Sequence, residues 1–296
     1  MNPIILTIGF FDGIHLGHKK LIDTTIRESG KAANTESLLI TFDKTPCKQS
    51  GLITTLPEKL GFLRAFNLDN IKIIPFTPQL KNLSPAQFFN KILLSDYAIK
   101  KIVIGYDFKF GKNRTGDSSV LQKLCHKHNI EIIKIHPVKY CHKIVSSSYI
   151  RSLISEGNFE SANKLLIYPF TISGKVIKGR GIAKKYKLVP TANLSVDTTK
   201  LLPAGVFFTK IIINTAVHNG IVNIGLSPTL IRGNSPLTAE VHIFNFGRNI
   251  VNKQIKLILL KKIRSEKKFG SIESLRAQIS KDIAAAKQIA HYQVKN

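Results

Sequence analysis

Short apolar runs alternate with amphipathic segments through the first half of the chain. The runs have the length and the β-branched content of buried strands, and they lie at residues 4–8, 38–42, 71–76, 102–104 and 130–135. Helical patterns separate them, at residues 18–29, 58–66, 84–93 and 118–128. This alternation predicts a parallel sheet with helices on both faces and ligands at the carboxyl ends of the strands.

The pattern changes after about residue 167. Strand-like segments now follow one another with turn signals between them, at residues 170–177, 206–213, 220–224, 239–246 and 254–260. Because little helix intervenes, we expect antiparallel pairing and a small barrel. A C-terminal helix then begins near Ser271, with Leu275, Ile279 and Ile283 on one stripe. The predicted fold class is therefore α/β followed by β, with domains at residues 1–167 and 168–296.

Composition agrees with a folded protein of two domains. The chain has 296 residues, of which 43% are hydrophobic, and it contains no apolar run of the ~20 residues that a membrane-spanning helix needs. It has no secretory signal pattern and only three cysteines, an odd number, so we expect a cytoplasmic protein without a disulfide framework. The histidines and cysteines between residues 125 and 142 match no zinc-ligand spacing.

The chain is strongly basic. It has 44 Lys and Arg against 18 Asp and Glu, a formal charge of +26. Such a surplus is compatible with a nucleic-acid partner, but the lysines are scattered and form no long basic tail. We therefore favour anionic small-molecule substrates, and we keep a nucleic-acid-binding protein as the less favoured alternative.

The segment after the first predicted strand has the residues of a phosphate-binding turn. His15 and His18 flank Gly17 directly before a helix. Imidazole N–H groups and a helix N-terminus both favour negative charge, and glycine lets a polyphosphate approach the backbone. The candidate phosphate-binding residues of this segment are Gly9, Phe11, Asp12, His15, Gly17 and His18.

Two later segments have the character of ligand-binding loops. Residues 105–117 follow a predicted strand and combine several glycines with Asp107, Phe108, Phe110 and Arg114. Residues 145–151 place hydroxyl groups at a helix start and an arginine one turn further on, which together suit a phosphate. The candidates in this segment are Ser147, Ser148 and Arg151.

Together the three segments resemble the nucleotidyltransferase half of the bacterial bifunctional riboflavin kinase/FAD synthetases. That family has a G-x-F-D-G-x-H-x-G-H turn, a G-x-D-F-x-F-G-x-x-R-x-G-D loop and an S-S-[ST]-x-I-R segment in this order, and all three are present here. The resemblance implies a Rossmann-like FMN adenylyltransferase domain over residues 1–167. It implies catalytic roles for His15 and His18, ATP binding by the turn and the serine segment, and flavin binding by Asp107, Phe108, Phe110 and Arg114.

The second half resembles the riboflavin kinase module of the same family. Gly179 and Gly181 precede a Pro-Thr-Ala-Asn segment, and Glu240 begins a strand that is otherwise largely apolar. A lone glutamate in such a strand is more often an edge or surface residue. The resemblance implies instead that Glu240 is the general base on the ribityl hydroxyl. It also implies that the two glycines bind ATP and that Thr191 and Asn193 bind Mg-ATP and the metal.

The expected activity is therefore phosphorylation of riboflavin to FMN and adenylylation of FMN to FAD with release of pyrophosphate. ATP is the co-substrate of both steps, and Mg²⁺ or another divalent cation is the expected cofactor. We expect small-molecule partners (riboflavin, FMN and ATP), no membrane, and a monomer or weak homo-oligomer. Ala183 and Lys187 stand where the family commonly has glycine, which leaves open a monofunctional FMN adenylyltransferase with a degenerate kinase module.

Overall fold

The computed structural model describes residues 2–44, 51–178, 189–226 and 237–294. The chain forms two compact units. The first consists of Met1–Ser50, Leu56–Tyr149 and Leu165–Tyr168, and the second of Gly51–Thr55, Ile150–Lys164 and Pro169–Asn296. Within the described ranges, none of the helices has both the length and the apolar character needed to cross a membrane.

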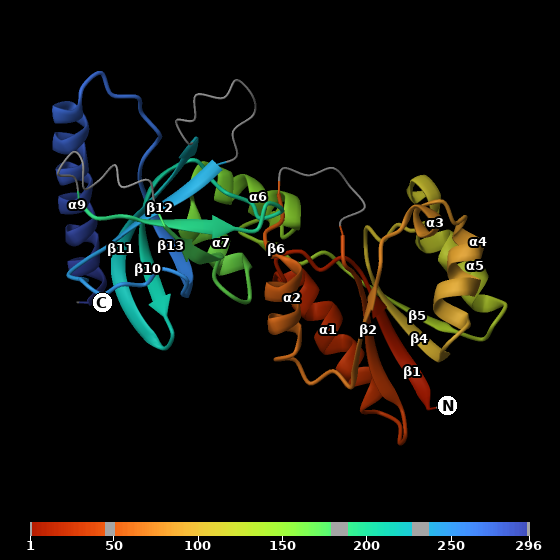
Figure 1. Ribbon diagram of the computed structural model, residues 1–296. Coiled ribbons are helices and arrows are strands. Elements are labelled where there is room, and N and C mark those ends of the chain that lie inside the picture. Colours follow the sequence, from red (N-terminus) through yellow and green to blue (C-terminus); the bar gives the residue numbers. More distant parts are fainter. Residues whose placement is uncertain (1, 45–50, 179–188, 227–236, 295–296) are drawn as a thin grey trace. The chain divides into compact units, whose positions relative to one another are not determined.

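A five-stranded parallel sheet forms the centre of the first unit (Figure 1). Its order is β3-β2-β1-β4-β5, and the strands are β1 (Pro3–Ile8), β2 (Glu36–Phe42), β3 (Asn70–Ile74), β4 (Ala98–Gly105) and β5 (Glu131–Ile135). The chain moves outward from β1 to β3 and then returns to place β4 on the other side of β1. The order therefore reverses between β1 and β4, and in such sheets ligands bind outside the strand ends at this point.

Helices cover both faces of this sheet (Figure 1). On one face, Leu39 of β2 packs with Ile22 of α1 (Leu16–Ser29) and Leu63 of α2 (Leu56–Leu63). On the other, alternate residues of β1 and β2 pack against four short elements, because successive strand side chains point to opposite faces. These elements are α3 (Pro78–Lys81), α4 (Pro85–Phe88), the π-helix η1 (Phe89–Leu94) and α5 (Ser118–His126). The remaining elements are the 3₁₀ turn η2 (Lys112–Arg114) and the hairpin of β6 (Lys139–Tyr140) and β7 (Lys143–Ile144).

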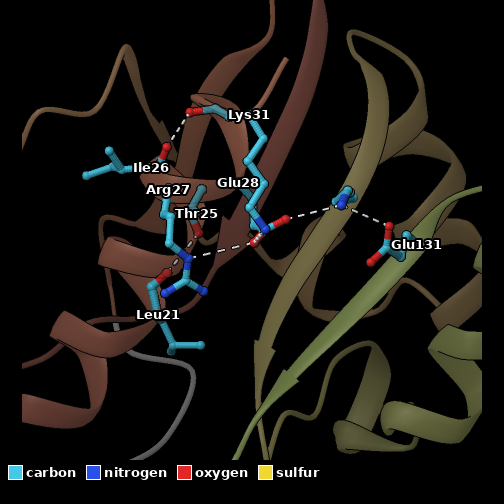
Figure 2. Close-up of polar contacts among 9 residues, drawn as sticks. Leu21, Thr25, Ile26, Arg27, Glu28, Lys31 and Glu131 are labelled. Atoms are coloured by element: carbon cyan, nitrogen blue, oxygen red, sulfur yellow. Dashed lines mark hydrogen bonds and ion pairs between the residues drawn. The ribbon is translucent and has the colours of Figure 1, made fainter.

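A buried carboxylate fastens the end of α1 to the sheet. Glu28 is 6% exposed, and it accepts hydrogen bonds from Lys31 at 2.6 Å and from Lys101 of β4 at 3.2 Å. Lys101 also pairs with Glu131, the first residue of β5, at 3.0 Å. Figure 2 shows Glu28 between these elements, with Arg27 beside it. The hydrogen bond from Lys31 has the largest effect on the pKa of Glu28. Together with Lys101, it holds that pKa below its ordinary value.

The second unit is a closed antiparallel barrel in the order β10-β11-β12-β9-β8-β13. Its strands are β8 (Thr171–Ile177), β9 (Ala192–Val196), β10 (Gly205–Ile213), β11 (Ala216–Leu226), β12 (Leu237–Ile243) and β13 (Gln254–Arg264). The long helix α9 (Ile272–Val294) packs on the barrel wall, where Ala286 meets Phe208 and Ile221 (Figure 1). Arg264 fixes this helix through Nε, which bonds both carboxylate oxygens of the buried Asp282.

Two helices precede the barrel in the chain, α6 (Ser147–Glu156) and α7 (Phe159–Leu165). Phe159 at the start of α7 is buried and packs its ring against Phe170 and Phe207. The second unit also includes residues 51–55, where Leu52 pairs with the segment around Lys200 through backbone hydrogen bonds.

The parallel α/β sheet, the closed barrel and the C-terminal helix confirm the predicted fold class. Two details differ. Strand β9 was not predicted, because only Leu194 in it is buried and the polar residues around it hide the alternation. The helix predicted at residues 84–93 is one turn of α-helix followed by the wider η1.

Candidate active sites

The turn between β1 and α1 has a tightly folded backbone. Phe11, Gly13 and Ile14 have φ values of 54°, 84° and 34°. Non-glycine residues rarely adopt this left-handed region, and it costs conformational energy. Such strain is kept where a site requires it, and here it brings His15 to the N-cap position of α1.

His15 is oriented by the helix that it caps. Its Nδ1 accepts a hydrogen bond from the backbone N–H of His18 at 3.3 Å. The neutral ring therefore carries its proton on Nε2, which is a donor for an anion. Gly17 makes room for this ring, because a Cβ on Gly17 would lie 3.1 Å from both Nδ1 and Cε1 of His15.

His18 stacks on His15 with ring centroids 3.6 Å apart. Its Nδ1 is buried and has no hydrogen-bond partner among the residues that the structure describes. Burial is the largest of the causes that lower the pKa of His18 well below its ordinary value. The neighbouring His15 and Lys59 lower it further. A neutral imidazole with an unused buried nitrogen, beside the N-terminus of a 14-residue helix, is suited to a polyphosphate.

The other predicted residues of the turn support the two histidines. Phe11 is buried, and its ring meets the edge of His18 at 5.2 Å. Gly9 passes close to that ring, since a Cβ there would lie 3.3 Å from it. Asp12 is also buried, and its backbone carbonyl accepts a hydrogen bond from the Ser147 hydroxyl at 2.9 Å. The first unit thus brings Ser147 to the histidine turn.

The serine segment forms the start of α6. The Ser146 hydroxyl accepts from the backbone N–H of Tyr149 and caps the helix, and Ser148 is exposed at its second position. Arg151, one turn further on, is buried in the second unit, where its Nε donates to the carbonyl of Gly51 at 3.3 Å.

A cavity of about 560 Å³ lies at the carboxyl ends of the strands. The predicted flavin-binding residues Asp107, Phe108, Phe110 and Arg114, from the loop after β4, all line it. Three further aromatic residues line the cavity and were not predicted: Phe10 after β1, Phe42 at the end of β2 and Phe76 after β3. A mainly apolar hollow with a few charged groups fits a planar aromatic ligand.

The loop after β4 is folded around Phe110. Phe110 and Gly116 exchange backbone hydrogen bonds of 2.9 Å in both directions. A Cβ on Gly116 would lie 2.7 Å from the Phe110 ring, so glycine is required there. Phe108 stacks on Phe110 at 5.5 Å with 20° between the rings. These contacts present both rings to the cavity.

In the barrel, Glu240 lies in a row of polar side chains. It is directly opposite Asn193 of β9 and Asn223 of β11 in the strand register, so the three side chains share one face. Its neighbours along the strand, Ala239 and Val241, are buried on the other face. Burial raises the pKa of Glu240 above its ordinary value, which suits a carboxylate that accepts a proton near neutral pH.

The segment before β9 is held by the same strand that carries Glu240. His242 Nδ1 lies 2.9 Å from the carbonyl oxygen of Pro190, to which it donates. Thr191 follows and is exposed. The sequence pattern did not indicate His242 or Asn223 as site residues. The predicted Gly179 and Gly181, and the substituted positions Ala183 and Lys187, lie outside the described residues.

The fold and these sites define a two-module transferase that acts on nucleotides. The first unit holds an anion-binding turn and an aromatic cavity at the carboxyl ends of a parallel sheet, and the second has a half-buried acid beside two amides. Residues 1–149 match the family model described as FAD synthetase, and residues 166–290 match the one described as riboflavin kinase. The chain belongs to the family of bifunctional riboflavin kinase/FMN adenylyltransferases.

Relatives with that name match nearly the whole chain. The protein of this name from Buchnera aphidicola of Schizaphis graminum is 38% identical, over 96% of this chain and 93% of its own length. The Escherichia coli K12 protein is 30% identical, over 96% and 92%. A crystal structure from Streptococcus pneumoniae, titled macrolide-efflux protein, superimposes with a TM-score of 0.80 at 26% identity, covering 95% of this chain and 92% of the other. Both modules are thus present, so the monofunctional alternative is not favoured.

Proposed function

We propose that the parallel-sheet unit transfers the AMP part of ATP to FMN. The unused buried Nδ1 of His18, beside the N-terminus of α1 in the unit that also holds the aromatic cavity, is the observation that carries this assignment. A phosphate oxygen of FMN attacks the α-phosphorus of ATP, and the bond between that phosphorus and the pyrophosphate oxygen breaks. FAD and pyrophosphate are the products, and no covalent enzyme intermediate is needed.

The histidine turn stabilises the charge that develops in this step. Nε2 of His15, the free nitrogen of His18 and the first N–H groups of α1 are donors for phosphate oxygens. The hydroxyls of Ser147 and Ser148 add donors from the start of α6, and Arg151 is assigned to phosphate binding on the family resemblance. Gly9, Phe11, Asp12 and Gly17 shape the turn, through the packing and close approaches described above.

The cavity holds the flavin of FMN. Phe108 and Phe110 present stacked rings to it, and aromatic faces bind a planar ring system by stacking. Asp107 and Arg114, at the same wall, supply a hydrogen-bond acceptor and a cation for the polar edge and the phosphate of the ligand.

The barrel unit phosphorylates riboflavin. Glu240 removes the proton of the ribityl hydroxyl as that oxygen attacks the γ-phosphorus of ATP, and ADP leaves. Its raised pKa and the adjacent amide of Asn193 support this role. Gly179 and Gly181 are assigned to ATP binding on the family resemblance.

A divalent cation, most simply Mg²⁺, fits beside Glu240. The Thr191 hydroxyl and the Asn193 amide oxygen are the hard oxygen donors that Mg²⁺ prefers, and Asn193 is opposite Glu240 in the strand register. When bound, the cation would neutralise charge on the phosphates. His242 keeps the segment with Thr191 in place through Pro190.

We extend the proposal to the protein as a whole. Residues 1–167 are assigned to adenylylation and residues 168–296 to phosphorylation, in a cytoplasmic protein that is a monomer or a weak homo-oligomer. Separate assays test the assignment. Supplied FMN and ATP should give FAD and pyrophosphate, and riboflavin and ATP should give FMN and ADP. If the purified chain forms no FAD, the adenylylation assignment is contradicted. If it forms no FMN, the phosphorylation assignment is contradicted.

A further inference from the structure

A buried lysine lies behind the histidine turn, and the reaction described above gives it no role. Lys59 of α2 is only 2% exposed. Its Nζ donates to the carbonyl of Phe10 at 3.0 Å, to the hydroxyl of Thr41 at 3.0 Å and to the carbonyl of Phe42 at 2.9 Å. A lysine side chain is almost never fully buried unless its charge is matched by such partners.

The three bonds form a closed network between two neighbouring strands. An ammonium group has three N–H donors, and all three are used here. The Thr41 hydroxyl in turn donates to the carbonyl of Phe10 at 3.1 Å. Phe10 follows β1 and Phe42 ends β2, so Lys59 joins the carboxyl ends of the two strands from which the site is built.

Both residues held by Lys59 line the cavity. Phe10 and Phe42 line it together with Phe108 and Phe110 of the loop after β4. The ammonium also lies 4.3 Å from the ring centroid of Phe10, a distance at which a cation attracts an aromatic face. One buried side chain therefore contacts the backbone of both residues and the ring of Phe10.

The surroundings of Lys59 connect it with the phosphate-binding turn. Burial lowers the pKa of Lys59 to about 8, while the carboxylates of Asp12 and Asp43 act in the opposite direction. The charge of Lys59 is also one of the causes that lower the pKa of His18. The group is thus a cation, placed within electrostatic reach of the turn.

We propose that Lys59 is a positioning residue for adenylylation: its ammonium fixes the ends of β1 and β2 and thereby fixes Phe10 and Phe42 as the wall against which the flavin binds. Lys59 itself contacts no substrate. The inference rests on the proposed function of this unit and adds a residue that sets the affinity for FMN.

The test compares Lys59→Met and Lys59→Arg with the wild-type full-length chain. Methionine removes all three bonds at similar volume. Arginine keeps the charge, but its planar fork cannot send three donors to the same converging oxygens. Arg64→Gln is the matched control, because it also removes one positive charge and lies exposed just after α2.

Each protein is assayed for FAD formation from FMN and ATP, and the same preparation is assayed for riboflavin phosphorylation. We expect Lys59→Met to raise the KM for FMN by about 10- to 100-fold, as small misplacements in a site can. Lys59→Arg should raise it by at least about fivefold on the same ground. Arg64→Gln should match the wild type, and phosphorylation should stay within about twofold in every variant, since the barrel is a separate unit.

A wild-type KM for FMN in a folded Lys59→Met would overturn the inference. Should circular dichroism show that this variant does not fold, Lys59→Arg decides, and an unchanged KM there overturns the inference equally. If the wild-type chain forms no FAD, the proposed function fails, whatever the variants show.

Discussion

The imidazole rings of His15 and His18 stack face to face, with centroids 3.6 Å apart and 16° between their planes. Two positive rings would repel each other at this distance, so the stack favours neutral imidazoles. The lowered pKa of His18 agrees with that charge state. The turn therefore meets the phosphates with oriented N–H donors and a helix terminus.

His18→Ala removes half of this pair. We expect the adenylylation rate to fall by about 100- to 1000-fold, as removal of one donor to a developing charge typically causes. Chromatography of a reaction with riboflavin and ATP should then show FMN accumulating without FAD. His126→Ala, on the exposed side of α5, is the control and should give normal FAD. Normal FAD formation by His18→Ala would contradict the role of the turn.

Gly17→Ala tests the space that His15 needs. The new Cβ would lie 3.1 Å from the His15 ring, so the ring must shift, and we expect adenylylation to slow by about tenfold. Alanine is the better helix former, so thermal unfolding should show no large loss of stability. Gly61→Ala in α2 is the control, because a Cβ there meets nothing within 4 Å. Unchanged kinetics in Gly17→Ala would mean that the ring position is not critical.

Glu240→Gln separates the two activities. It should lower the rate of riboflavin phosphorylation by about 100- to 10,000-fold, the usual contribution of a general base, and leave adenylylation of supplied FMN intact. In the wild type, phosphorylation should weaken as the pH falls through the raised pKa of Glu240, because the protonated acid cannot accept a proton. Glu273→Gln, exposed in the first turn of α9, should behave as the wild type in both assays. A fully active Glu240→Gln would exclude the acid as the base.

Glu28→Gln tests the contact shown in Figure 2. It leaves Lys31 without this carboxylate and Lys101 with Glu131 alone, and we expect the free energy of unfolding at pH 7 to fall by about 1 to 3 kcal/mol. Because the folded-state pKa of Glu28 is lowered, its stabilisation is present above the unfolded pKa of about 4.3 and is lost as the pH falls through the folded value. The difference between variant and wild type should therefore disappear in acid.

Urea unfolding at several pH values measures this difference. Asp23→Asn is the control, since it removes an exposed carboxylate that pairs with Lys19 on the same helix, and such pairs contribute only about 0.5 kcal/mol. Equal effects of the two substitutions would show that burial of Glu28 adds nothing.

The sequence predicted the parts of the sites whose residues have distinctive chemistry. His15 and His18 stand within two residues of a glycine in the turn after a clear strand, and the residues of the loop after β4 cluster within ten positions. Phe42 and Phe76 were missed, because an aromatic residue at a strand end is also typical of the core. The rule that ligands bind at carboxyl ends of parallel strands could have indicated Phe42.

The sequence did not indicate the other site residues, because their positions in the site depend on strand register and packing. Asn223 and His242 gain their positions from the pairing of β12 with β11 and from the turn before β9, and β9 itself has too few buried residues to be recognised. Lys59 is one of 44 Lys and Arg residues, and only the fold shows that its amine is buried between two strands.

The most direct test supplies the purified chain with riboflavin, ATP and Mg²⁺ and follows flavins and pyrophosphate over time. The account predicts that FMN appears first, that FAD follows, and that one pyrophosphate is released for each FAD formed. Absence of FAD and of pyrophosphate, even when FMN itself is supplied, would contradict it.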